Sequence, residues 1–82
     1  GWFGSDEQGW YHMNPDDGAM LAAQWFEVKG KHYYATKTGE IAKNVYVKST
    51  APGVYCWVND SGEWVKEWDT TMPDLQTYGL AE

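Results

Sequence analysis

The segment WFEVKGKHYYATKTGEI, residues 25–41, decides the fold of this chain. Two short runs rich in aromatic and β-branched residues, 25–28 and 32–35, flank a Lys-Gly-Lys turn in which Gly30 can adopt a positive φ. Such a pattern predicts a β-hairpin, and a further turn is expected at Gly39. No part of the chain shows a sustained 3.6-residue period with helix caps, so we expect almost no helix.

The second half of this hairpin recurs on both sides of it. An aromatic-rich triplet, a short polar stretch, a glycine and an apolar residue two places later occur at residues 10–20, 32–41 and 55–64. The three glycines are residues 18, 39 and 62, so they stand 21 and then 23 residues apart. A period of this size is typical of repeat proteins, in which each unit buries one face against its neighbour.

We therefore predict an all-β solenoid of stacked β-hairpin repeats that ends in an irregular C-terminal cap. The repeats are expected at about residues 1–23, 24–43 and 44–65, followed by a cap or dimerisation tail at 66–82.

Composition narrows the functions open to such a chain. Its 82 residues include six Trp and six Tyr, more than a small core requires, so several rings should lie exposed on a surface for binding or assembly. The net charge of −6 is unsuited to nucleic acid, which demands a basic surface. No apolar run approaches the 18 or so residues of a membrane span, so we expect no membrane insertion.

Few residues suggest catalysis or metal binding. Cys56 is the only cysteine, so no internal disulfide can form, and its place between Tyr55 and Trp57 suits a small buried residue. His12 and His32 are the only histidines, too few and too far apart in the sequence to predict a metal site. No nucleophile elbow, phosphate-binding loop or Ser-His-Asp set is present. We expect no enzyme, no cofactor and no metal.

Three segments together resemble the cell-wall-binding repeat family, namely Gly9-Trp10-Tyr11, Gly18-Ala19-Met20 and residues 25–34. This family includes the choline-binding repeats of streptococcal surface proteins, autolysins and phage lysins, and the related glucan-binding repeats. Its pattern is roughly G-W, W-Y-Y, G-A-M and again G-W; the first two units match it well and the third loosely. The resemblance covers the chain to about Trp64 and implies a hairpin solenoid with ligands held between consecutive hairpins.

The resemblance also implies which residues form aromatic cages around a quaternary ammonium. By position, the first cage would consist of Trp2, Trp10, Tyr34 and Met20. The second would consist of Trp25, His32 and Trp57. His32 stands where the family usually has Trp, and a third cage is not expected because Val45 offers no π face.

The expected function is a non-catalytic module that holds choline of teichoic acids and anchors a larger secreted protein to a bacterial surface. The chain would then be secreted or associated with the cell wall. Because Trp and Tyr also stack on sugars, glucan or other polysaccharide binding is the alternative, and a structural or dimerising module with degenerate grooves is a third. The apolar C-terminal segment could fold back over the third hairpin or meet its copy, and we expect a homodimer through that end.

Overall fold

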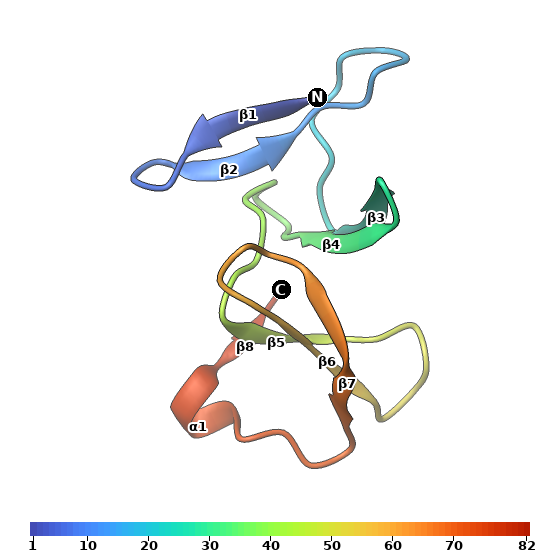
Figure 1. Cartoon of the computed structure of the whole chain (residues 1–82), viewed down its shortest axis with the longest axis vertical. Coiled ribbons are helices and arrows are strands. Elements are labelled where there is room, and N and C mark those ends of the chain that lie inside the picture. Colours follow the sequence, from blue (N-terminus) through green and yellow to red (C-terminus); the bar gives the residue numbers. More distant parts are fainter.

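Antiparallel hairpins follow one another along the long axis of the molecule in the computed structural model, which describes residues 1–82 (Figure 1). The first pairs β1 (Trp2–Ser5) with β2 (Gly9–His12), and the second pairs β3 (Gln24–Val28) with β4 (Lys31–Ala35). The third pairs β5 (Val45–Lys48) with β6 (Tyr55–Val58). The predicted all-β stack of hairpin repeats is confirmed, and the structure contains no helix with the length and hydropathy of a membrane span.

The turn of the second hairpin shows why the sequence folds locally as it does. Lys29 and Gly30 are its two central residues, and both have positive φ, 52° and 82°. A two-residue turn of this handedness matches the right-handed twist of the flanking strands, and glycine is well suited to it. The turn fixes a register that places Trp25 opposite Tyr34 and Phe26 opposite Tyr33.

A left-handed residue precedes the first strand of the second and third units alike. Ala23, before β3, has a φ of 55°, and Asn44, before β5, has a φ of 54°. The same backbone bend therefore starts both repeats, although the two residues differ. Asparagine tolerates this region, whereas alanine is strained in it.

Replacing Ala23 with glycine should stabilise the protein by about 0.5–1 kcal/mol, because glycine adopts the positive φ without strain. Thermal or urea unfolding measures the change. Ala22→Gly is the matched control, since Ala22 does not have a positive φ, and it should be neutral or destabilising. Equal effects of the two substitutions would contradict the explanation.

The C-terminal segment is more regular than the sequence suggested. β7 (Trp64–Thr70) pairs with β6, and β8 (Leu80–Ala81) pairs in parallel with β5, which gives the sheet order β7-β6-β5-β8. Between them lies α1 (Leu75–Tyr78), whose N-cap Asp74 accepts a hydrogen bond from the Thr77 N–H. Strand β7 runs across residues 65 and 66, where the predicted boundary between repeat and tail falls.

The C-terminal segment folds back over the third hairpin. The Trp57 ring lies 5.2 Å from Tyr46, 5.8 Å from Trp68 and 5.0 Å from Tyr78, measured between ring centroids. Tyr46 and Trp57 belong to the third hairpin, and Trp68 and Tyr78 to the C-terminal segment. These rings cover the end face of the stack.

The main core lies between the second and third units. Ala42, Val47 and Val58 are buried there, and the rings of Trp25, Tyr34 and Trp64 pack around them. The face of the second hairpin that carries Trp25 and Tyr34 thus packs on one side of this core, and the four-stranded sheet packs on the other side. This packing fixes the position of β3 and β4 above the sheet.

Candidate functional site between the hairpins

Side-chain alternation decides which rings enter each space between hairpins. In the first hairpin, Trp2 lies opposite His12 and Gly4 opposite Trp10, so Trp2, Trp10 and His12 share one face. That face meets Phe26 and Tyr33 of the second hairpin. Between ring centroids, Trp2 lies 4.9 Å from Tyr33, and His12 is stacked on Phe26 at 4.9 Å. The two hairpins are therefore joined through aromatic rings.

A groove opens beside this aromatic contact, with a volume of about 570 Å³. We call it the first groove; its lining residues are Trp2, Asp6, Trp10, Tyr33, Ile41, Lys43, Asp60 and Ser61. Of the six tryptophans, Trp10 is the one whose ring is paired with no other aromatic ring. Its indole therefore presents a face to the groove rather than to the core.

Polar contacts hold the Trp10 indole in place. Its Nε1 donates a hydrogen bond of 2.8 Å to Asp6 Oδ1, and Lys43 Nζ lies 3.5 Å from the same oxygen. The Trp10 hydrogen bond and the Lys43 charge hold the pKa of Asp6 below its usual value. The carboxylate is therefore charged at neutral pH and compensated by Lys43, while Asp60 keeps the groove acidic overall.

Two residues predicted for this cage lie elsewhere. Tyr34 points to the opposite side of β4, where its ring centroid lies 5.3 Å from Trp25 and it packs on the core. Its neighbour Tyr33 faces the first hairpin instead, because adjacent residues of a strand point to opposite faces. Met20 is outside the groove, beside Gly39, where a Cβ would come within 2.7 Å of the Met20 methyl carbon.

A second groove lies between the second hairpin and the four-stranded sheet, with a volume of about 330 Å³. Its lining residues are Trp25, His32, Ser49, Thr50, Ala51, Val54, Cys56, Trp64 and Asp69. The structure thus brings Trp25 and His32 together, as expected, but the ring facing them is Trp64 of β7. Its centroid lies 6.4 Å from that of Trp25 and 5.4 Å from that of His32.

The predicted third member of this cage, Trp57, is absent from the second groove. It is 7% exposed and packs on the end face of the stack with Tyr46 and Tyr78. The residue of the third hairpin that matches Tyr33 in position is Cys56, the middle residue of its triplet. Where the first groove has a phenol ring, the second groove therefore has a thiol.

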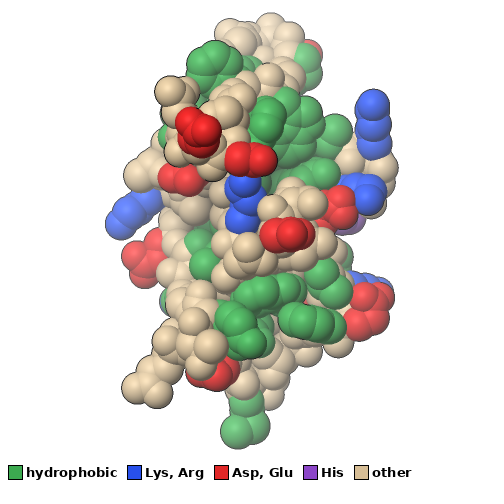
Figure 2. Space-filling view, turned by 60° about the vertical axis from the view of Figure 1, so that its left-hand side comes forward, with side chains coloured by type: hydrophobic (Ala, Val, Ile, Leu, Met, Phe, Trp, Pro, Cys, Tyr) green, Lys and Arg blue, Asp and Glu red, His purple; other side chains and the backbone are tan.

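Figure 2 shows hydrophobic side chains gathered in separate areas of one face, with acidic and basic side chains between them.

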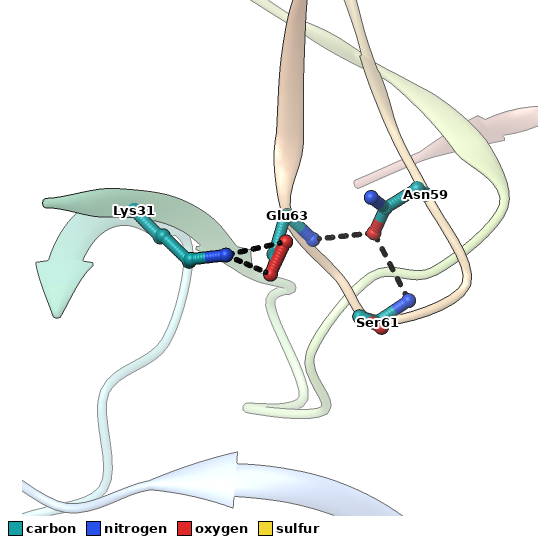
Figure 3. Close-up of polar contacts among 4 residues, drawn as sticks. All are labelled: Lys31, Asn59, Ser61 and Glu63. Carbon is teal, nitrogen blue, oxygen red and sulfur yellow. Dashed lines mark hydrogen bonds and ion pairs between the residues drawn. The ribbon is translucent and has the colours of Figure 1, made fainter. Parts of the chain in front are cut away.

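One ion pair links the second and third units directly: Lys31 Nζ lies 2.9 Å from Glu63 Oε2 (Figure 3). Glu63 follows a tight turn in which Asn59 Oδ1 accepts hydrogen bonds from the N–H groups of Ser61 and Glu63. The turn thus aims Glu63 at Lys31, and the hydrogen bonds and charge of Glu63 raise the pKa of Lys31.

The chemistry around Cys56 is unsuited to nucleophilic catalysis. The side chain is buried, and burial together with the nearby Asp69 carboxylate raises the pKa of the thiol to about 12. The thiolate, which is the reactive form, is therefore scarce at neutral pH. No group of three or more His, Cys, Asp or Glu side chains converges to hold a metal ion.

His12 adds a pH-sensitive element to the first interface. Its Nδ1 is buried without a hydrogen-bond partner, between the rings of Trp2 and Phe26. Burial, and secondarily the Gly1 ammonium, lowers the pKa of His12 below the ordinary 6.5. The unfolded chain therefore takes up this proton more readily than the folded protein does.

The stability that depends on neutral His12 should be complete above about pH 6.5 and lost as the pH falls through the lower pKa of the folded protein. Melting temperatures at pH 7.5 and pH 5 measure the loss. His12→Phe keeps a ring against Phe26 but cannot titrate, so its melting temperature should fall less between these pH values. An equal fall in both proteins would show that His12 is not the group responsible.

Comparison with solved structures identifies relatives of this arrangement. A scan against protein-family models found no match, and a search of curated proteins found none either. The choline binding domain of Spr1274 from Streptococcus pneumoniae is 42% identical over 79% of this chain and 69% of that one, with a TM-score of 0.60. Choline binding protein F from the same organism is 40% identical over 79% of this chain, with a TM-score of 0.60.

The chain spans 19% of choline binding protein F, so that protein is much longer. The Cpl-1 endolysin, solved with a peptidoglycan analogue, has the same fold with a TM-score of 0.66 at 20% identity. The 42% identity across most of the Spr1274 domain, together with the shared hairpin stack, shows the family. This chain belongs to the choline-binding repeat family.

Proposed function

We propose that this chain is a non-catalytic module that holds choline groups of teichoic acids between its hairpins and anchors a larger secreted protein to a bacterial surface. The observation that carries the proposal is the first groove. There Trp2 and Trp10 of one hairpin and Tyr33 of the next line one pocket, and the Trp10 ring is free of aromatic partners. The identity with a choline-binding domain supports the same ligand.

The groove has the chemistry that a quaternary ammonium requires. Such a cation cannot donate a hydrogen bond, so it is held by ring faces, each worth about 0.5–2 kcal/mol depending on desolvation. Two carboxylates, Asp6 and Asp60, against one ammonium, Lys43, leave the rim acidic. Both the rings and the net charge therefore favour a cation over a neutral or anionic ligand.

Calorimetric titration with choline tests the proposal. We expect a dissociation constant of about 1 mM, which corresponds to about −4 kcal/mol and thus to two or three ring contacts. The matched control is 3,3-dimethylbutan-1-ol, which has the shape of choline without its charge and should bind at least about tenfold more weakly. Equal affinity for this alcohol, or no binding of choline, would overturn the proposal.

The polysaccharide alternative is tested in the same experiment with glucan oligosaccharides. Binding of oligosaccharides without binding of choline would replace the choline module by a glycan-binding one. Anchoring is tested with a fluorescent protein fused to the chain. The fusion should bind cell walls that carry choline and be released by free choline, and retention on walls free of choline would contradict this mechanism.

The C-terminal end offers a surface for the expected homodimer. Trp68 is 57% exposed, Met72 87% and Tyr78 48%, although all three are apolar or aromatic. Association of two such surfaces would remove them from water, and a symmetric pair is the commonest oligomer.

Sedimentation velocity should therefore show a dimer that Trp68→Ser combined with Met72→Ser converts to a monomer. Truncation after Lys66 is unsuitable for this test, because it would remove part of β7 and all of β8 from the sheet. Lys66→Ser, on the same strand but not apolar, is the control. A monomer at all concentrations in the unmodified protein would rule out the dimer.

A further inference from the structure

The two grooves differ in the side chain that forms their third wall, and we propose that they bind different cations. We infer that the second groove prefers an ammonium that carries at least one N–H, such as a primary amine, over a quaternary ammonium. This inference rests on the proposed function, because it takes both grooves as cation sites.

The walls of the second groove combine ring faces with a carboxylate. Trp25, His32 and Trp64 supply the rings, and Asp69 of β7 lines the same groove. Trp64 Nε1 donates a hydrogen bond of 2.7 Å to Asp69 Oδ1, which holds the carboxylate beside the indole. A cation that enters between the rings therefore meets a hydrogen-bond acceptor as well as π faces.

The first groove has a matching pair in Trp10 and Asp6, but the negative charge of Asp6 is already compensated by Lys43. Lys43 Nζ lies 3.5 Å from Asp6 Oδ1, whereas no Lys, His or terminal ammonium lies within ion-pair distance of Asp69. The carboxylate of the second groove thus has no cationic partner within the protein. A ligand ammonium can take the place that Lys43 occupies in the first groove.

The third wall of the second groove also favours an ammonium with an N–H over a quaternary ammonium. Tyr33 closes the first groove with a ring, and Cys56 occupies the equivalent position in the second. A quaternary ammonium gains most from a complete set of rings, because its methyl groups cannot donate hydrogen bonds. An ammonium with an N–H gives up part of the ring contact and gains a charge-assisted hydrogen bond to Asp69.

His32 also lines the second groove, beside Cys56 and Asp69, and its Nε2 lies 3.9 Å from Glu27 Oε1. A protonated His32 would repel a cationic ligand. All ligands are therefore compared at a single pH, so that the charge state of His32 is the same in every titration.

Trimethylammonium and tetramethylammonium differ by one N–H and provide the test. The indole N–H resonances of Trp10 and Trp64 report separately on the two grooves and are assigned with Trp10→Phe and Trp64→Phe variants. We expect the Trp64 signal to titrate with trimethylammonium at about fivefold lower concentration than with tetramethylammonium. The Trp10 signal should show equal affinity or the reverse order.

Asp69→Asn and Asp6→Asn are matched variants. Asparagine can still accept the indole hydrogen bond, so each variant removes the charge and leaves the tryptophan in place. Asp69→Asn should abolish the preference for trimethylammonium at Trp64, and Asp6→Asn should leave that preference intact. A preference that survives Asp69→Asn would overturn the inference.

The outcomes separate this inference from the proposed function. Equal or tighter binding of tetramethylammonium at Trp64, or a response at Trp10 alone, would overturn the inference and leave choline binding at the first groove intact. No response at either indole would overturn both.

Ethanolamine and Nα-acetyl-lysine methylamide then distinguish two sources of a primary ammonium. A polymer headgroup is represented by ethanolamine, and a peptide side chain by the lysine derivative. We expect both to displace trimethylammonium from the second groove, and the tighter of the two identifies the source. Failure of both would overturn the assignment to primary amines.

Discussion

Replacing Trp25 with alanine should lower the free energy of unfolding by about 3 kcal/mol, a large part of the stability of a domain of this size. The Trp25 ring packs on the core of Ala42, Val47 and Val58 and lies 5.3 Å from the Tyr34 ring. Its Nε1 also donates a hydrogen bond of 3.3 Å to the Lys48 carbonyl oxygen, which ties β3 to the third unit. Alanine would leave a cavity where the second hairpin meets the sheet.

Urea unfolding followed by circular dichroism measures this loss. Trp68→Ala makes the same chemical change at a ring that is 57% exposed, and it should cost less than half as much. If the two variants were equally stable, the core between the second and third units would not be the main source of stability.

The hairpins could be predicted because their signals are local. The turn at Lys29 and Gly30, the aromatic triplets and the spaced glycines each specify structure within a few residues. The order of the repeats follows from the chain, since consecutive units stack on one another. None of these inferences requires knowledge of a distant contact.

The cages were predicted less well because they depend on which face of a strand meets the previous hairpin. Tyr34 and Trp57 were each chosen one residue too far along, and one residue in a strand means the opposite face. Alternation alone would have favoured Tyr33, because it points away from His32. The third repeat shows the same error, since the strand register places Tyr46, not Val45, in the position of Trp25.

The second groove could not be predicted because its third ring comes from outside the hairpins. Trp64 lies two residues after the glycine of the third motif and begins β7, the longest strand of the molecule. The turn at residues 59–62 precedes this strand, but its pairing with β6 includes an irregularity between Tyr55 and Trp57 that no local pattern indicates. The approach of Asp69 to the groove follows from that pairing and has no local sequence signal.

Trp10→Ala should weaken choline binding at the first groove by at least about tenfold while leaving the protein folded. The Trp10 indole pairs with no other ring, and its hydrogen bond goes to Asp6 in the loop of its own hairpin. Its loss should therefore remove one wall of the groove without opening the aromatic contact of Trp2 with Tyr33. Calorimetry measures the affinity, and thermal melting checks the fold.

Trp10→Phe is the graded control, because phenylalanine keeps a smaller π face but loses the hydrogen bond to Asp6; its affinity should lie between those of the alanine variant and the unmodified protein. Tyr33→Leu and Tyr34→Leu separate the two faces of β4. The first should weaken choline binding, whereas the second should mainly lower stability, because Tyr34 packs on the core. If Trp10→Ala left the affinity for choline unchanged, the cation would not lie against this indole, and the assignment of the first groove as the choline site would be wrong.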